Sequence, residues 1–404
     1  HHYTNPGIYV VKLTVTDDVN NSVSVTSTVV VFQSPVLTKP ADQVVCNGTN
    51  TQNVNFVTVP SSTVNSWTNN HPEIGLAASG TGNIASFTAV NTTNAPIVAT
   101  ITVNPVFRGC TGAAQTFTIT VNPTPAVNSI TDQTICNGET IAAITFGSNV
   151  AGSTFTWVND NTTIGLAASG TGNIASFQGV NLGTTPEVAN IKVTATANGC
   201  NSAAQGFKIT VKPTPALTST LVPAAICSNA VFNYTPQSNV TGTTFNWTRA
   251  AVAGISNPAA SGTGDPNETL INTTDNPITV TYVYSLTAAN CSAAQVYDVK
   301  VVVNPSPKLS SSATPAAICS GTTFSYSPTS STAGATFAWS RAAVAGISNP
   351  AANGTNNPSE TLINTTNAPI PVVYVYTITA NGCVNTNNVT VIVNPAPVTD
   401  FTIN

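Results

Sequence analysis

The segment Thr279-Val-Thr-Tyr-Val-Tyr-Ser-Leu286 has large apolar residues at every second position from Val280 to Leu286. Thr and Ser fill most of the positions between them. A period of two residues predicts a β-strand with one buried face. The same pattern recurs about 90 residues later, from Val372 to Ile378. The chain therefore contains at least one repeated, half-buried strand.

A second strand pattern carries a tryptophan. Phe245 and Trp247 lie on one face of an alternating segment, with Thr and Asn on the other. The four tryptophans hold corresponding positions in four repeated segments: Trp67, Trp157, Trp247 and Trp339. A sugar-stacking platform is one reading, but a tryptophan beside Phe on an alternating strand is typical of a sandwich core. We expect about seven strands in each segment of about 90 residues, which predicts immunoglobulin-like β-sandwiches.

The composition supports an all-β chain and excludes several partners. Charged residues make up 6% of the 404 residues and Met is absent, so strong helix formers are scarce. There is no Lys/Arg cluster of the kind that nucleic acid or an anionic membrane surface requires. No stretch approaches the roughly 18 apolar residues of a membrane span, so we expect no membrane insertion in this segment. The chain also opens in mid-motif, which favours a piece of a longer protein.

The cysteines set the period of the repeats. Taken in order, they form four pairs whose members are 64 residues apart, and the first members are spaced by 90, 91 and 92 residues. Fixed spacing with an even count predicts one disulfide inside each repeat and an oxidising compartment. We expect each bridge to join the N-terminal region of a domain to the turn before its last strand, worth about 4 kcal/mol. The predicted pairs are Cys46–Cys110, Cys136–Cys200, Cys227–Cys291 and Cys319–Cys383.

Proline pairs mark the predicted domain boundaries. Asn122-Pro-Thr-Pro125 recurs in similar form at Lys212, Asn304 and Asn394. Two prolines in four residues cannot lie in a central strand, and they stiffen a junction. The predicted domains are a C-terminal half-domain at 1–33, repeat 1 at 34–123, repeat 2 at 124–213, repeat 3 at 214–305, repeat 4 at 306–395 and the start of a further repeat at 396–404.

Catalytic or cofactor chemistry is not expected, because the residues for it are missing. A catalytic triad requires a histidine, and the histidines are His1 and His2 at the start of the chain and His71. Repeat 2 has Asn161 at the position of His71, which we interpret as a solvated loop residue. The paired cysteines leave no zinc ligand set. Gly80-Thr-Gly82 lacks the lysine of a phosphate loop, and we interpret it as a hairpin turn. We predict no enzyme activity, no cofactor and no metal.

Two acidic groups remain as weak calcium candidates. Asp17 and Asp18 precede two asparagines, an order that fits a turn better than a calcium corner. Asp265, Glu268 and Asp275 are close in the sequence of repeat 3. Repeat 4 replaces two of these carboxylates with asparagine, which argues against a shared charged site.

Several motifs resemble PKD domains. The segment 2–17 resembles the closing half of such a domain through Tyr3, Pro6-Gly7, Tyr9, Leu13, Val15 and Asp17. The full repeats resemble the PKD-like modules of giant cell-surface proteins of Bacteroidetes, the family of the gliding-motility adhesin SprB. The motifs that carry the resemblance are Ile135-Cys-Asn-Gly, the segment from Ile164 to Phe177, Ile318-Cys-Ser-Gly, Ala-Asn-Gly-Cys and the Asn-Pro-x-Pro linkers. The resemblance implies type IX secretion, display on the outer cell surface and a role in adhesion or gliding.

Three functions are compatible with these patterns. The first is a non-catalytic stalk that extends an adhesive region, with glycan or protein ligands bound outside this segment. The second is direct binding of glycans or proteins by the repeats. The third is a spacer beside a secreted enzyme. The loops are near copies within each of two subtypes, repeats 1 and 2 and repeats 3 and 4. Such uniform loops favour a stalk or weak multivalent contact over specific recognition.

Overall fold

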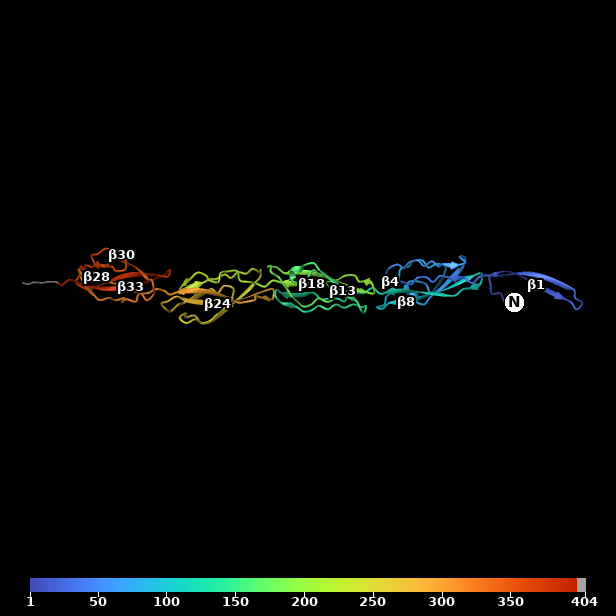
Figure 1. Cartoon of the computed structure of the whole chain (residues 1–404). Helices are drawn as coiled ribbons and strands as arrows, with labels where there is room; N and C mark the ends of the chain where they lie inside the picture. The colour runs from blue at the N-terminus through green and yellow to red at the C-terminus, as the bar shows by residue number, and fades with distance from the viewer. Residues whose placement is uncertain (398–404) are drawn as a thin grey trace, which may run out of the picture. The chain divides into compact units, whose positions relative to one another are not determined.

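The computed structural model describes residues 1–397, and strands dominate all of it (Figure 1). The helical elements of this part are two short 3₁₀ turns, η1 (Pro72–Ile74) and η2 (Thr162–Ile164). The predicted all-β class is thus confirmed. The predicted further repeat at 396–404 lies almost wholly outside the described residues.

The first element is a hairpin of β1 (Gly7–Thr16) and β2 (Ser22–Val31), paired from Gly7–Val31 to Thr16–Ser22. Asp17 closes its turn, because one carboxylate oxygen accepts hydrogen bonds from the backbone N–H groups of Val19 and Asn21. The Asp17 carboxyl therefore has its pKa lowered, chiefly by the backbone hydrogen bond from Asn21. The turn interpretation of this acidic segment is confirmed.

The strands of the first two repeats follow the same order. Repeat 1 contains β3 (Val36–Leu37), β4 (Gln43–Cys46), β5 (Thr58–Val59), β6 (Val64–Asn69), β7 (Ser79–Thr81), β8 (Ile97–Phe107), β9 (Cys110–Thr111) and β10 (Gln115–Asn122). Repeat 2 contains β11 (Gln133–Cys136), β12 (Thr140–Ile141), β13 (Thr154–Asn159), β14 (Ser169–Thr171), β15 (Phe177–Gln178), β16 (Glu187–Ala197), β17 (Cys200–Asn201) and β18 (Gln205–Lys212).

Repeats 3 and 4 are built alike. Repeat 3 contains β19 (Ile226–Cys227), β20 (Ala230–Phe232), β21 (Thr244–Arg249), β22 (Ala260–Thr263), β23 (Glu268–Leu270), β24 (Ile278–Ala288), β25 (Cys291–Ser292) and β26 (Tyr297–Asn304). Repeat 4 contains β27 (Ile318–Cys319), β28 (Thr323–Phe324), β29 (Thr336–Arg341), β30 (Ala352–Thr355), β31 (Glu360–Thr361), β32 (Ile370–Ala380) and β33 (Cys383–Asn394).

Each repeat has a large sheet and a small one. In repeat 3 the large sheet has the order β19-β26-β24-β21-β22, with β25 on β24, and β20 pairs with β23 in the small sheet. The short strand that carries the first cysteine runs parallel to the last strand, so that Cys227 pairs with Asn304. All the other pairings of this large sheet are antiparallel. The first cysteine therefore lies where its repeat ends.

The core lies on the alternating face that the sequence predicts. Val280, Tyr282, Tyr284 and Leu286 are buried on β24, and the residues between them are more exposed. The two subtypes fill the same space differently, because β8 and β16 carry Ile and Val where β24 and β32 carry tyrosines. The tandem immunoglobulin-like fold is confirmed.

The chain divides into two compact units. Unit 1 comprises His1–Asn181 and Pro186–Val211, and unit 2 comprises Leu182–Thr185 and the chain from Lys212 onward. Unit 1 thus holds the hairpin, repeat 1 and most of repeat 2, and unit 2 holds repeats 3 and 4. The bounds of the individual repeats remain predictions.

Candidate functional site: the junctions between repeats

The two cysteines of one repeat lie at opposite ends of its sandwich. In repeat 4, β33 begins at Cys383 and ends at Asn394, and Asn394 pairs with Cys319. At about 3.3 Å per residue, this strand holds the two cysteines roughly 36 Å apart. A disulfide requires Cα atoms within about 7 Å. Cys319 and Cys383 therefore cannot pair within their repeat.

The disulfides instead join neighbouring repeats. Cys46 of repeat 1 is bonded to Cys200 of repeat 2 with a Cα–Cα distance of 5.7 Å, across a sequence separation of 154 residues. Cys227 of repeat 3 is bonded to Cys383 of repeat 4 at 5.6 Å, across 156 residues. Cys136 and Cys291 are also disulfide-bonded, whereas Cys110 and Cys319 carry free thiols.

The predicted pairing inside each repeat is therefore wrong. None of Cys46–Cys110, Cys136–Cys200, Cys227–Cys291 and Cys319–Cys383 is formed, because the bonds of Cys46, Cys200, Cys227 and Cys383 all run between repeats. The prediction that all eight cysteines are bonded is also wrong. The first cysteine of one repeat and the second cysteine of the next form a strap across the junction.

An asparagine side chain crosses each of these two junctions beside the strap. The Asn122 side-chain amide donates a 2.9 Å hydrogen bond to the backbone carbonyl of Asn198. Asn304 makes the same 2.9 Å bond to the carbonyl of Asn381. Asn122 is 5% exposed, which shields this bond from water. Each junction thus has a covalent contact and a directional polar contact next to each other.

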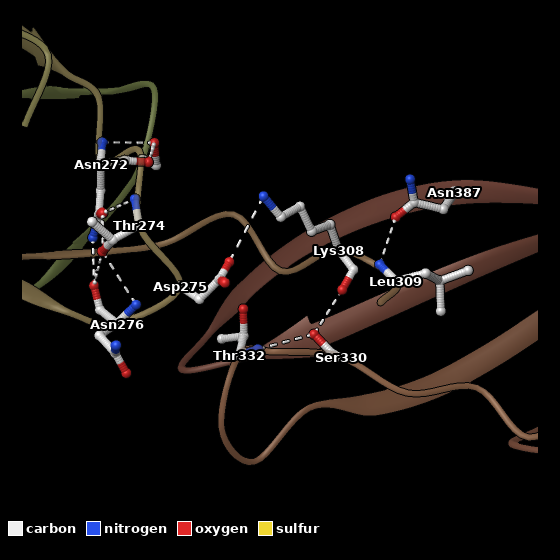
Figure 2. Close-up of polar contacts among 10 residues, drawn as sticks. Asn272, Thr274, Asp275, Asn276, Lys308, Leu309, Ser330, Thr332 and Asn387 are labelled. Atoms are coloured by element: carbon white, nitrogen blue, oxygen red, sulfur yellow. Dashed lines mark hydrogen bonds and ion pairs between the residues drawn. The ribbon is translucent and has the colours of Figure 1, made fainter. Parts of the chain in front are cut away.

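A second polar contact differs between the junctions. Between repeats 1 and 2, the Asn149 amide donates to the Asn94 side-chain oxygen at 2.9 Å. Between repeats 3 and 4, the Lys308 ammonium lies 3.8 Å from an Asp275 carboxylate oxygen (Figure 2). The side chains of this ion pair are 59% and 38% exposed, so its contribution to stability is small.

A buried asparagine anchors each cysteine segment to its own repeat. The Asn272 amide donates to the carbonyls of Asn276 and Val303 at 2.7 and 2.8 Å (Figure 2 shows the first bond). Its backbone N–H donates to Ser228 Oγ, immediately after Cys227. The corresponding asparagines of the other repeats are Asn91, Asn181 and Asn364. This role was not predicted from the sequence, although Asn-Thr-Thr recurs in repeats 1, 3 and 4; in repeat 2 Leu and Gly follow Asn181.

Repeats 3 and 4 also share a buried ionic cluster. The guanidinium of Arg249 donates to both carboxylate oxygens of Glu268, at 2.8 and 2.9 Å, and to the carbonyl of Pro258 at 2.6 Å. Tyr282 donates its hydroxyl to Glu268 at 2.6 Å. Repeat 4 repeats the arrangement with Arg341, Glu360 and Tyr374. In each cluster the carboxylate is held by the arginine and the tyrosine hydroxyl, and the arginine side chain is buried, so these groups serve packing between the two sheets.

The electrostatics of this cluster follow from its contacts. Hydrogen bonds from Arg249 lower the pKa of Glu268, against the effect of burial. Burial alone would raise the pKa of Glu360, and hydrogen bonds from Arg341 and Tyr374 outweigh it and lower that pKa. Both carboxylates are therefore ionised partners of an arginine at neutral pH.

The other candidate residues occupy structural positions. Asp265 accepts hydrogen bonds from the backbone of Tyr234 and Asn267. Glu268 belongs to the ionic cluster and Asp275 to the junction, so the three acidic residues do not form one site. His71 lies at the start of η1, with its ring 2.7 Å from Glu73. Within the described chain, no three His, Cys, Asp or Glu side chains are grouped so as to hold a metal ion.

The tryptophans lie in the cores, each beside a glycine of the neighbouring strand. Trp67, Trp157, Trp247 and Trp339 are 5–7% exposed. Trp67 pairs with Gly80, and a Cβ on Gly80 would lie 2.2 Å from the indole ring. Gly80 is therefore a strand residue required by close packing, which corrects its interpretation as part of a hairpin turn. Gly82, with φ of 72°, does follow the strand in a turn conformation.

Comparison with known proteins defines the class of these repeats. The model of the PKD-like domain family matches residues 224–307 and 316–397. This match covers repeats 3 and 4, and the fold of the described residues is a tandem array of immunoglobulin-like domains to which PKD-like domains are similar. No curated protein matches the chain.

Solved structures resemble the chain only distantly. The three immunoglobulin domains I67–I69 of titin, in an E-to-A mutated variant, align with a TM-score of 0.43 and 11% identity, covering 68% of this chain and 99% of that chain. Domains EC3–6 of protocadherin gammaB7 align with a TM-score of 0.33 and 10% identity, covering 89% of this chain and 100% of that chain. Domains EC1–4 of Drosophila N-cadherin align with a TM-score of 0.24 and 9% identity, covering 88% of this chain and 99% of that chain. These scores are too low to support an argument about function. Among residues 1–397, no helix is long and apolar enough to cross a bilayer.

Proposed function

We propose that the chain is a non-catalytic extracellular stalk segment that carries tension between the regions it connects. The observation behind the proposal is the pair of disulfides that cross repeat junctions. Disulfides persist in oxidising compartments outside the cytosol. A bond that joins two sandwiches contributes nothing to a chemical site, but it fixes how force passes from one domain to the next.

The straps shorten the covalent path through the chain. From Cys46 the path crosses to Cys200, which leaves residues 47–199 outside the line of tension. From Cys227 it crosses to Cys383, which leaves residues 228–382 outside it. Repeat 4 is then traversed along β33 alone, a strand that is already extended. Unfolding the rest of the repeat would lengthen this path very little.

The wider biological role rests on the motif resemblance. Attachment to an outer cell surface, export by type IX secretion and a part in adhesion or gliding are the roles of the Bacteroidetes proteins with similar motifs. The glycan or protein ligands of such a stalk would bind regions outside this segment. The near-identical loops of paired repeats support a spacer rather than a set of specific binding sites.

Single-molecule force spectroscopy on the full chain tests the proposal. A repeat of 90 residues has a contour length of about 320 Å, so its unfolding in a reduced chain should release roughly 280 Å. In the oxidised chain, the 13 residues from Cys383 to Pro395 reach at most about 47 Å. We expect steps of about 280 Å only after reduction.

A matched variant separates the strap from other effects of the reductant. In the oxidised double variant Cys46→Ser with Cys200→Ser, this strap no longer bypasses residues 47–199, and repeat 1 returns to the line of tension. One long step from repeat 1 should then appear while the strap between repeats 3 and 4 remains closed. Steps of about 280 Å in the oxidised unsubstituted chain would contradict the proposal.

A further inference from the structure

The free thiol of Cys319 occupies the same position as two bonded cysteines. Cys319 pairs with Asn394 in parallel register, as Cys46 pairs with Asn122 and Cys227 with Asn304. The residue after each cysteine donates its backbone N–H to the carbonyl of that same asparagine, at 2.7–2.9 Å. The local scaffold that presents a strap cysteine is therefore complete in repeat 4.

The surroundings of Cys319 differ from those of its counterparts in one respect. Cys319 is exposed, whereas Cys46 and Cys227 are partly covered at their junctions. Its neighbour Asn394 is the counterpart of Asn122 and Asn304, whose amides donate to a carbonyl of the following repeat. The thiol and the amide thus lie side by side at the end of repeat 4, in the arrangement that receives a repeat elsewhere.

We infer that Cys319 and Asn394 form a covalent docking site for a β-sandwich repeat placed C-terminal to repeat 4. The incoming repeat must present a cysteine equivalent to Cys200 or Cys383, in a turn whose carbonyl accepts from the Asn394 amide. Both features are found in the turns before β17 and β33, where Asn198 and Asn381 supply that carbonyl. The inference shares the cross-junction pairing with the proposed stalk function and adds the partner of the free thiol.

The bond forms by oxidation of two thiols. With a small disulfide such as oxidised glutathione as the oxidant, one glutathione first forms a mixed disulfide with one protein thiol. The second protein thiolate then displaces that glutathione. In sum, two protein S–H groups and one glutathione disulfide give one protein disulfide and two reduced glutathiones.

An extended chain tests the inference. A second copy of residues 306–395 is inserted after residue 395 of the full chain, which places the copied Cys383 154 residues after Cys319, the separation seen for Cys46–Cys200. After oxidation with the glutathione couple, free thiols are alkylated and the disulfides are mapped without reduction. We expect Cys319 to be linked to the copied Cys383 and the copied Cys319 to be alkylated.

Controls decide between the outcomes. Replacing the copied Cys383 with Ser should leave Cys319 alkylated. A second chain, extended with residues 124–213 instead, keeps the test valid if the copy of repeat 4 does not fold. Alkylated Cys319 in both extended chains, or its capture by a second molecule, would overturn the inference. The Cys46–Cys200 bond mapped in the same sample reports separately on the strap pattern of the proposed function.

Discussion

Arg249 and Glu268 form a bidentate ion pair, in which the arginine side chain is 1% exposed and the glutamate side chain is 19% exposed. The pair joins the end of β21 to β23, and so ties the large sheet of repeat 3 to its small one. Repeats 1 and 2 have Asn69 and Asn159 at the end of the corresponding strand, where each amide donates to a backbone carbonyl. The two subtypes therefore close the same corner by different chemistry.

Removing the arginine should destabilise repeat 3 strongly. Arg249→Met leaves the Glu268 carboxylate partly buried without its partner, a change that typically costs about 3–5 kcal/mol. The double variant Arg249→Met with Glu268→Leu removes both charges and should recover much of that loss. Hydrogen exchange of β24 peptides measures the effect in repeat 3, with the β32 peptides of repeat 4 as an internal control. Equal protection in the single variant and the unsubstituted chain would contradict the account.

Acid should weaken repeats 3 and 4 before repeats 1 and 2. The hydrogen bonds from Arg249 hold the pKa of Glu268 below its ordinary value, so the folded state binds this proton less readily than the unfolded state. The stability that the pair contributes is complete above pH of about 4.3 and declines as the pH falls towards the folded-state pKa. Hydrogen exchange between pH 6 and 3 checks the order of loss. If the double variant Arg249→Met with Glu268→Leu lost protection in repeat 3 over the same pH range, the ion pair would not be the cause of the acid sensitivity.

A methyl group on the glycine beside a core tryptophan should not be tolerated. Trp247 pairs with Gly262, and a Cβ there would lie 2.7 Å from the indole. Gly262→Ala should therefore cost about 1–3 kcal/mol through overpacking. Urea denaturation followed by tryptophan fluorescence measures the loss. Gly206→Ala, whose Cβ would meet one atom at 3.8 Å, is the matched control and should have a much smaller effect.

Replacing the buried asparagine that anchors a cysteine segment should destabilise its repeat. Asn272→Ala removes two donated bonds and leaves the carbonyl of Val303 without that donor, a loss of about 1–3 kcal/mol. The end of β26 should loosen, because Asn272 joins it to the segment after Cys227. Hydrogen exchange of the peptide that ends at Asn304 tests this, and unchanged protection would be inconsistent with an anchoring role.

The sequence was sufficient to predict the fold for a simple physical reason. Strand alternation reflects which side chains are buried, and this is a local property that the segment from Val280 to Leu286 displays directly. The four tryptophans and the turn at Asp17 followed from equally local patterns. The acidic residues of repeat 3 were harder to interpret, because the partner of Glu268 lies 19 residues away at Arg249.

The disulfide pairing could not be predicted from spacing alone. A separation of 64 residues within each repeat fixes the phase of the cysteines but not the end of the sandwich at which each one lies. That depends on the parallel pairing of β4 with β10, which takes Cys46 to the end of repeat 1. Parallel pairing of a two- to four-residue strand leaves no periodic signal in the sequence. The pairing across junctions therefore appears only when the register of the sheets is known.

Non-reducing peptide mapping of the oxidised, alkylated chain tests the central claim most directly. We predict peptides that link Cys46 to Cys200 and Cys227 to Cys383, with the alkylating reagent on Cys110 and Cys319. Peptides that link Cys46 to Cys110 and Cys319 to Cys383 would contradict it, and with it the proposed tension path.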